Sequence, residues 1–290
     1  MKHSIDPKID CVFKAILGSE ENRNLLIHFL NAVLADELPT PIVAVELLNP
    51  HNERETLNDK LSIVDVKAKD ASGRLFQIEI QLSSYSSLPP RILYTWCDIY
   101  AQQLTSGRGY DELRPTYSIW LLDQTLFNDA DHVHDFKPRD RQGRSLVEHG
   151  GIWTFELTKL PPQGEIDSEI ERWLMFFKTG EALDDEALPA WMQTEEMRQA
   201  MSTVRQFSEK ERQYHEYQAR MNFLRQQRAI EADLEQARRE KEQERREKEQ
   251  ARREKAQARQ AEEQVRREKE AALVEIERLK AELLKRQDNH

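Results

Sequence analysis

The sequence has little cysteine, and residues 231–290 lack aromatic residues, glycine and proline altogether. Cys11 and Cys97 are the only cysteines, and neither sits in a C-x-x-C or Cys/His pattern. This scarcity argues against a disulfide scaffold and against a cysteine-ligated metal. We expect two buried thiols in a reducing compartment.

Long apolar runs are missing as well. The most apolar stretch, Leu25–Ala35, contains His28 and Asn31 and is too short to span a bilayer. The first residues do not form the apolar segment that defines a signal peptide. We therefore expect a soluble, cytoplasmic protein that makes no membrane contact.

The net negative charge comes entirely from the first part of the chain. Residues 231–290 contain 17 basic and 17 acidic residues, so the net charge of −10 belongs to residues 1–230. A body this acidic is a poor non-specific coat for nucleic acid, because phosphate binding is driven by basic patches. The charge is compatible with a nuclease whose acidic pocket binds a divalent metal.

Helices and strands alternate along the first 230 residues, which predicts an α/β (α+β) fold with a mixed sheet flanked by helices. We divide the chain into a core at 1–160, a helical extension at 161–230 and a charged helix at 231–290. Helices are predicted at 10–17, 20–34, 89–105, 167–178, 190–206 and 209–230, and strands at 42–48, 62–69, 74–81, 117–123 and 152–157.

The last segment is predicted to be a long charged helix. Residues 238–258 read RREKEQE, RREKEQA and RREKAQA, a repeat of seven residues. A stable coiled coil needs apolar residues at two positions of each heptad, and only residues 265–284 approach that pattern. The upstream heptads favour a solvated single helix. Whether the chain forms a homodimer through a weak coiled coil at 265–284 stays open.

A predicted β-hairpin is the most informative segment. Asp70-Ala71-Ser72-Gly73 is a turn signal, with Gly73 available for the left-handed position of a three-residue loop. A loop at 71–73 pairs residue 65 with 79 and residue 63 with 81. The side chains on one face are then Asp65, Glu79 and Gln81, and those packing on the other are Val64, Val66, Ile78 and Ile80.

Two carboxylates on one face of a hairpin suit a divalent metal. Mg²⁺ prefers oxygen ligands and commonly takes one or two carboxylates, so we predict Asp65 and Glu79 as ligands, with the carbonyl of Ile80 as another. Mn²⁺ is the alternative ion. Gln81 would orient the attacking water or contact the phosphate. The alternative for the whole pattern is a solvated hairpin face.

Six motifs occur in one order along residues 5–160. Together they resemble the recombination-promoting nucleases, a transposase-like family of the PD-(D/E)xK superfamily. The motifs are DCVFKAILG at 10–18, LNAVL at 30–34, KLSIVDV at 60–66, IEIQ at 78–81, RILY at 91–94 and QLTSGRGY at 103–110.

The resemblance implies a restriction-endonuclease-like fold and a bacterial, Mg²⁺-dependent DNA endonuclease acting in recombination or mobile-element biology. Asp65 matches the metal-binding Asp of the superfamily, and Glu79 matches its D/E position. Gln81 stands where Lys is usual, and it supplies a dipole where Lys would supply a cation. E-x-Q is nevertheless the usual form in this family.

Other residues are weaker candidates. Asp10 is either a further acidic ligand or a helix N-cap. Lys14 and Lys60 could replace the missing cation, and Lys67 and Arg91 could bind phosphate, although exposed ion pairs explain the latter two equally well.

One further candidate site and two alternatives to the DNA endonuclease remain. The alternating His132 and His134 could bind metal, but a solvated acidic loop is the interpretation we favour. The chain could also be a catalytically inactive, nuclease-fold scaffold or DNA-bridging protein assembled through its C-terminal helix. Cleavage of RNA would use the same metal chemistry.

Overall fold

The computed structural model describes residues 4–50, 64–82, 87–161, 166–184, 187–209 and 213–225, together with some positions between 227 and 278. The chain divides into two units, Met1–Leu224 and Arg225–His290. The described positions of the second unit are helical, and residues 265–284 lie almost wholly outside the described part. No helix within the described residues has the length and apolar character needed to cross a membrane.

The first unit is built on one mixed sheet of six strands in the order β1-β2-β3-β4-β6-β5. The first three strands are antiparallel, β3, β4 and β6 run parallel, and β5 returns antiparallel to β6. The strands are β1 (Val45–Leu47), β2 (Val66–Asp70), β3 (Leu75–Gln81), β4 (Thr116–Leu122), β5 (Val133–Phe136) and β6 (Gly150–Glu156).

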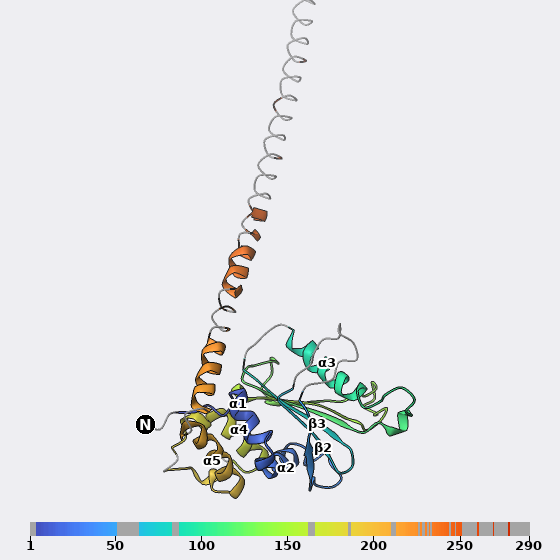
Figure 1. Cartoon of the computed structure of the whole chain (residues 1–290). Coiled ribbons are helices and arrows are strands. Elements are labelled where there is room, and N and C mark those ends of the chain that lie inside the picture. Colours follow the sequence, from blue (N-terminus) through green and yellow to red (C-terminus); the bar gives the residue numbers. More distant parts are fainter. Residues whose placement is uncertain are drawn as a thin grey trace, which may run out of the picture. The chain divides into compact units, whose positions relative to one another are not determined.

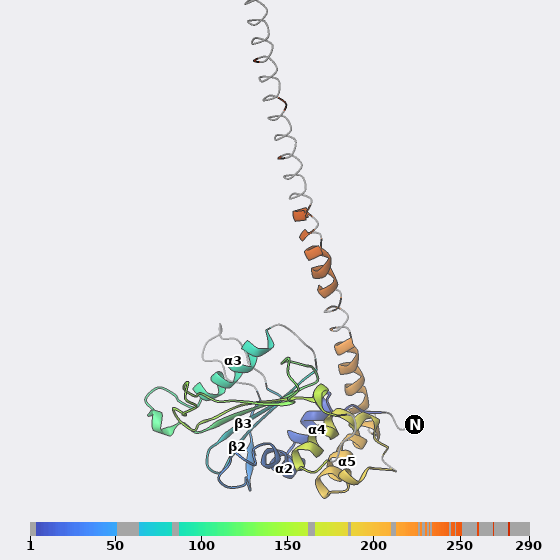
Figure 2. The same cartoon turned by 180° about the vertical axis from the view of Figure 1, so that it is seen from behind.

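Helices cover both faces of the sheet, as Figures 1 and 2 show from opposite sides. Within residues 4–209, four α-helices lie on one side, where an aromatic cluster around Trp173 and Phe29 forms the main core. α3 (Leu88–Ala101) lies along the other side, over Trp120 and Leu122. The four are α1 (Asp10–Leu17), α2 (Arg23–Val33), α4 (Glu169–Thr179) and α5 (Glu195–Glu209). The predicted α/β fold is confirmed.

Several local predictions are wrong. The segment that contains β5 was predicted to be a polar loop. Its sequence, Val-His-Asp-Phe, gave no sign of a strand because β5 is an edge strand without a buried face. Val64 packs with Leu75 and Ile99 on the α3 side of the sheet, because β2 begins only at Val66 and the alternation stops there. Cys11 is half-buried and Cys97 is exposed, so the two thiols are free but not both buried.

A helix at residues 213–225 closes the first unit. Tyr217 is buried in the main core, and its hydroxyl oxygen accepts a hydrogen bond from the N–H of Asp6 at 3.1 Å. Tyr217 is also the last buried residue in the described part of the chain. The core of the first unit therefore depends on residues far beyond its last strand.

We expect a chain that ends at residue 234 to retain the free energy of unfolding of the full chain. A chain that ends at residue 212 should lose about 3 kcal/mol or more, because it lacks a buried aromatic side chain. Chemical denaturation of the two truncations measures both values. An unfolded or insoluble chain ending at 234 would show that residues 235–290 help to stabilise the core.

Candidate metal centre

A tight turn sets the register of the β2–β3 hairpin. Gly73 has φ of 84°, and its N–H donates to the Asp70 carbonyl oxygen at 3.0 Å. The Asp70 carboxylate accepts from the N–H groups of Ser72 and Arg74 and pairs with the Arg74 guanidinium at 2.6 Å. Val66 pairs with Ile78, so the predicted register is confirmed for the described residues. Residue 63, predicted opposite Gln81, lies outside them.

Asp65 lies directly before β2 and is bound to two other elements. Its Oδ2 accepts a hydrogen bond from the N–H of Ile80 in β3 at 3.0 Å. Its Oδ1 lies 3.2 Å from the ammonium of Lys14 in α1. The backbone N–H of Ile80 therefore fixes Asp65 across the hairpin, and Lys14 pairs with its carboxylate.

Glu79 is the most buried carboxylate of the hairpin, with 3% of the residue exposed. Its Oε2 lies 3.6 Å from Nη2 of Arg91 in α3. Its Oε1 is buried and has no hydrogen-bond partner among the described residues. Burying an unsatisfied carboxylate oxygen is costly, and a metal ion is the ligand that such an oxygen suits.

The electrostatics of both carboxylates reflect this burial. Burial, followed by the negative charge of Asp65, raises the pKa of Glu79 well above its ordinary value, against the opposing effect of Arg91. Burial also raises the pKa of Asp65, although the Ile80 N–H and Lys14 counteract it. Two acids that resist ionisation side by side are typical of a functional site.

Gln81 and Arg91 lie at the same site and contact one another. Nη1 of Arg91 donates to Oε1 of Gln81 at 3.2 Å, and the guanidinium carbon lies 5.5 Å from the ring centre of Trp120. Arg91 therefore links Glu79 and Gln81, the two residues of the E-x-Q motif. Arg91 therefore lies beside the predicted ligands, and its role in binding phosphate stays a prediction.

Asp10 is not a helix N-cap. It is the first residue of α1, Ile9 occupies the cap position, and the cap makes no side-chain hydrogen bond. Oδ1 of Asp10 instead pairs with Nε of Arg220 at 2.9 Å. The ligand alternative for Asp10 stays a prediction.

One pocket of about 240 Å³ brings these groups together. Its lining includes three acidic side chains, from α1 and from the hairpin, and three basic ones. The residues lining it are Lys8, Asp10, Asp65, Glu79, Ile80, Gln81, Leu82, Arg91, Arg220 and Leu224. The predicted ligands therefore share one cavity with Asp10. Lys67 lines a different pocket, and Lys60 lies outside the described residues.

Arg220 and Lys8 are site residues that the sequence interpretation missed. Arg220 lies 210 positions from its partner Asp10, so sequence spacing could not link the two. A usable signal is the stripe formed by Tyr217, Met221 and Leu224, which predicts that one helix face docks on the body. Arg220 flanks that stripe.

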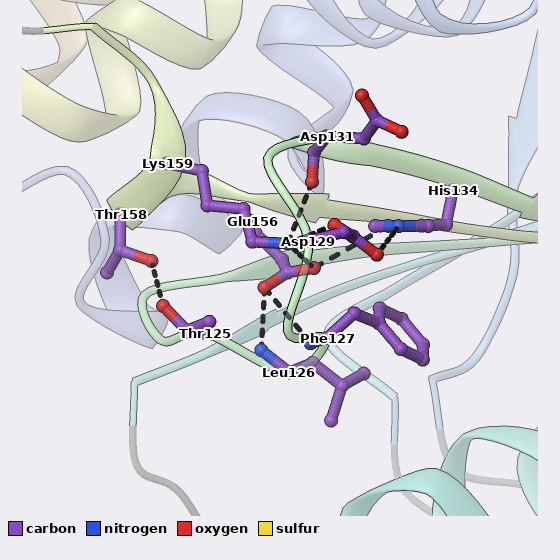
Figure 3. A network of polar contacts seen from close by, with 9 residues as sticks. All are labelled: Thr125, Leu126, Phe127, Asp129, Asp131, His134, Glu156, Thr158 and Lys159. Atoms are coloured by element: carbon purple, nitrogen blue, oxygen red, sulfur yellow. Dashed lines mark hydrogen bonds and ion pairs between the residues drawn. The ribbon is translucent and has the colours of Figure 1, made fainter.

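A second polar cluster lies at the end of β6 (Figure 3). Asp129, His134 and Glu156 approach one another closely enough to hold a metal ion. However, the ammonium of Lys159 lies 2.7 Å from Asp129 Oδ1 and 3.0 Å from Glu156 Oε1 (Figure 3). The protein's own cation is therefore already paired with two of these three groups.

The same cluster fixes the chain that follows β4. Oε2 of the buried Glu156 accepts from the N–H of Leu126 at 2.6 Å, and Lys159 also donates to the carbonyl of Asp131 (Figure 3). His134 belongs to this network through Asp129, 3.1 Å away. The segment is thus a structured network, and the solvated loop that we favoured describes it only in part.

Comparison with known proteins adds one match. A family model described as PD-(D/E)XK nuclease family transposase matches residues 7–233. This span includes the hairpin, α3 and the helix that carries Arg220. No curated protein and no solved structure matches the chain.

The raised pKa of Glu79 makes a prediction about stability. Between the ordinary pKa and the raised one, the folded state binds more protons than the unfolded chain. The free energy of unfolding therefore falls as the pH rises through this interval. Without added metal at pH 8, Glu79→Gln should raise the midpoint of thermal unfolding.

Glu171 is the matched control, because its pKa is shifted the opposite way. Hydrogen bonds from the N–H groups of Asp167 and Ser168 lower the pKa of Glu171. Its contribution to stability is present above the unfolded pKa and is lost as the pH falls through the folded one. Glu171→Gln should lower the midpoint at pH 8. Equal shifts in both variants would contradict the assignment.

Proposed function

The chain belongs to the PD-(D/E)XK nuclease family of transposases, and on that premise we propose that it is a metal-dependent DNA endonuclease. It would hydrolyse phosphodiester bonds in recombination or mobile-element biology. The observation that carries the proposal is the buried Glu79, whose unpartnered oxygen lies in one pocket with Asp65.

The donor set of the pocket fits a hard divalent cation. Asp65 and Glu79 would hold Mg²⁺, with Mn²⁺ as the alternative, and the Ile80 carbonyl and Asp10 are further candidate ligands. A bound metal ion supplies an activated water and neutralises charge on the phosphate. The unpartnered oxygen of Glu79 is the feature of this structure that supports metal binding.

The chain's own residues have distinct tasks around that ion. Lys14 and the Ile80 N–H hold Asp65 in place. Arg91 orients Gln81, whose amide dipole can face the attacking water or the phosphate. The cation that Lys supplies elsewhere in the superfamily has candidates here in Lys14, which pairs with Asp65, and in Arg220, which lines the pocket.

The boundaries and partners stay proposals. We propose that DNA is the substrate. We also propose that the chain forms a homodimer through residues 265–284. Arg220 and Leu224 line the pocket, so the helical extension at 161–230 would be part of the catalytic body together with the core at 1–160. The helix at 231–290 would act outside the reaction.

Plasmid nicking tests the proposal directly. Full-length protein should convert supercoiled DNA to nicked DNA with Mg²⁺ or Mn²⁺ and not with EDTA. Asp65→Ala and Glu79→Ala should each lower the rate at least about 100-fold, because even outer-shell changes cost about 10- to 100-fold. Asp140→Ala, which removes a carboxylate from a distant exposed turn, is the control and should cut normally.

The outcomes separate the alternatives. A folded wild type that is inert with both metals favours the scaffold or DNA-bridging function. Normal cutting by the folded Asp65 and Glu79 variants means that the site is wrong. Faster cleavage of RNA than of DNA of the same sequence would reassign the substrate.

The ion pair between Arg220 and Asp10 makes a separate prediction. If Asp10 is a ligand, the guanidinium competes with the metal for its carboxylate. Arg220→Ala should then tighten Mn²⁺ binding, and Asp10→Asn should weaken it about 10- to 100-fold. Titration calorimetry measures both. Unchanged affinity in both variants would assign the pair a purely structural role.

A further inference from the structure

A second pocket lies beside the turn of the β2–β3 hairpin. Its volume is about 710 Å³, larger than that of the candidate metal pocket. It is bounded by β2, the hairpin turn, the end of α3 and the segment that follows α3. The basic residues that line it are Lys67, Lys69, Arg108 and Arg114. We call it the basic groove.

Lys67 and Lys69 of the basic groove lie on the same face of the hairpin as Glu79 of the metal pocket. Lys69 pairs across the strands with Leu75, which packs on Ile99 of α3. Glu79, four residues farther along β3, pairs with Arg91 of the same helix. Four residues of strand span roughly 13 Å. The groove therefore lies beside the end of α3, roughly 13 Å along the hairpin from Glu79.

Hydrogen bonds hold the wall of the basic groove in a defined conformation. The side chain of Gln103 accepts a hydrogen bond from the N–H of Arg114 at 2.9 Å and donates to its carbonyl oxygen at 3.0 Å. The segment between these residues is thereby closed into a loop. Gln103 begins the QLTSGRGY motif, for which the metal pocket has no role, and Thr105 and Arg108 of that motif line the groove.

Arg114 is positioned across the hairpin turn. Its Nη1 donates to the carbonyl oxygens of Asp111 and Leu113 at 3.0 and 3.1 Å, contacts that hold the guanidinium and leave its charge in place. Its side chain lies over Gly73. A Cβ atom added to Gly73 would lie 3.1 Å from Cγ of Arg114. A larger residue at this turn would push the arginine aside.

The lining is basic although the body as a whole is acidic. Four basic residues and one acidic residue, Glu112, line the groove. Lys69 pairs with Glu46 and Arg108 pairs with Glu112, both in ion pairs whose side chains are largely exposed. Such pairs contribute little to stability and exchange readily for phosphate. An acidic protein that must bind DNA needs a local surface of this kind.

We propose that the basic groove binds the DNA backbone about four base pairs from the phosphodiester that is cut. The distance follows from the roughly 13 Å between groove and acidic pocket and the 3.4 Å rise of each base pair. The inference rests on the proposed endonuclease function and adds a substrate-binding surface to it. Phosphate contacts in the groove would position the duplex, and would read no sequence.

The test removes two exposed charges of the groove. Full-length Lys69→Ala/Arg108→Ala is compared with Arg139→Ala/Arg144→Ala, which removes two charges from a turn outside the groove. Binding of a fluorescent DNA duplex is measured by anisotropy in EDTA over a range of salt concentrations. Lys69→Arg/Arg108→Lys, which keeps both charges, is the rescue variant.

The groove variant should bind more weakly, and its slope of log K against log salt should fall by about 1.8, or 0.9 for each lost phosphate contact. The control and rescue variants should match the wild type. A groove variant with the slope and affinity of the wild type would overturn the inference, and so would tighter binding of an RNA duplex of the same sequence.

Plasmid nicking distinguishes this failure from failure of the proposed function. If the wild type cuts DNA and the groove variant binds and cuts equally well, only the proposed role of the basic groove is refuted. If the wild type neither binds nor cuts DNA, the proposed endonuclease function itself is refuted.

Discussion

The cost of burying the Glu79 carboxylate next to Asp65 is the constraint around which the first unit is arranged. Two like charges close together in a largely buried place oppose ionisation, and three separate elements hold them there. The hairpin brings the carboxylates together, α1 supplies Lys14 and α3 supplies Arg91. The unfavourable arrangement is stable because the surrounding sheet and helices form a large apolar core. Strain of this kind is expected where a protein keeps a site ready for a ligand.

The two polar clusters of the protein solve the same problem differently. Near the end of β6, Lys159 lies between Asp129 and Glu156, so the carboxylates have an internal cation. At the hairpin, the nearby cations leave one oxygen of Glu79 without a hydrogen-bond partner in the part of the chain that the structure describes. The carboxylates of the first cluster are therefore paired with a cation of the protein itself, whereas the proposed function assigns an external ion to the second. This contrast, rather than the number of acidic residues, distinguishes the candidate metal centre.

Local signals predicted the part of the site that is local in sequence. The Gly73 turn determines the hairpin register, and the register alone places Asp65 beside Glu79. The alternation of helices and strands predicted the mixed sheet with its helices, which the structure confirms. The order of motifs predicted the family, which the family match confirms. Arg220 could not be predicted, because its contact with Asp10 depends on how a distant helix docks. β5 was missed because pairing with β6, rather than its own apolar pattern, makes it a strand.

The exposure of Cys97 gives the molecule a natural attachment point for a probe. The thiol lies on α3, the helix that runs between the acidic pocket and the basic groove. Burial raises the pKa of both thiols, that of the half-buried Cys11 to about 11, so the exposed Cys97 is the thiol that reacts faster with alkylating reagents. A fluorophore can therefore be attached selectively at Cys97 of the unaltered sequence. Its signal would report the arrival of a nucleic acid on the α3 face.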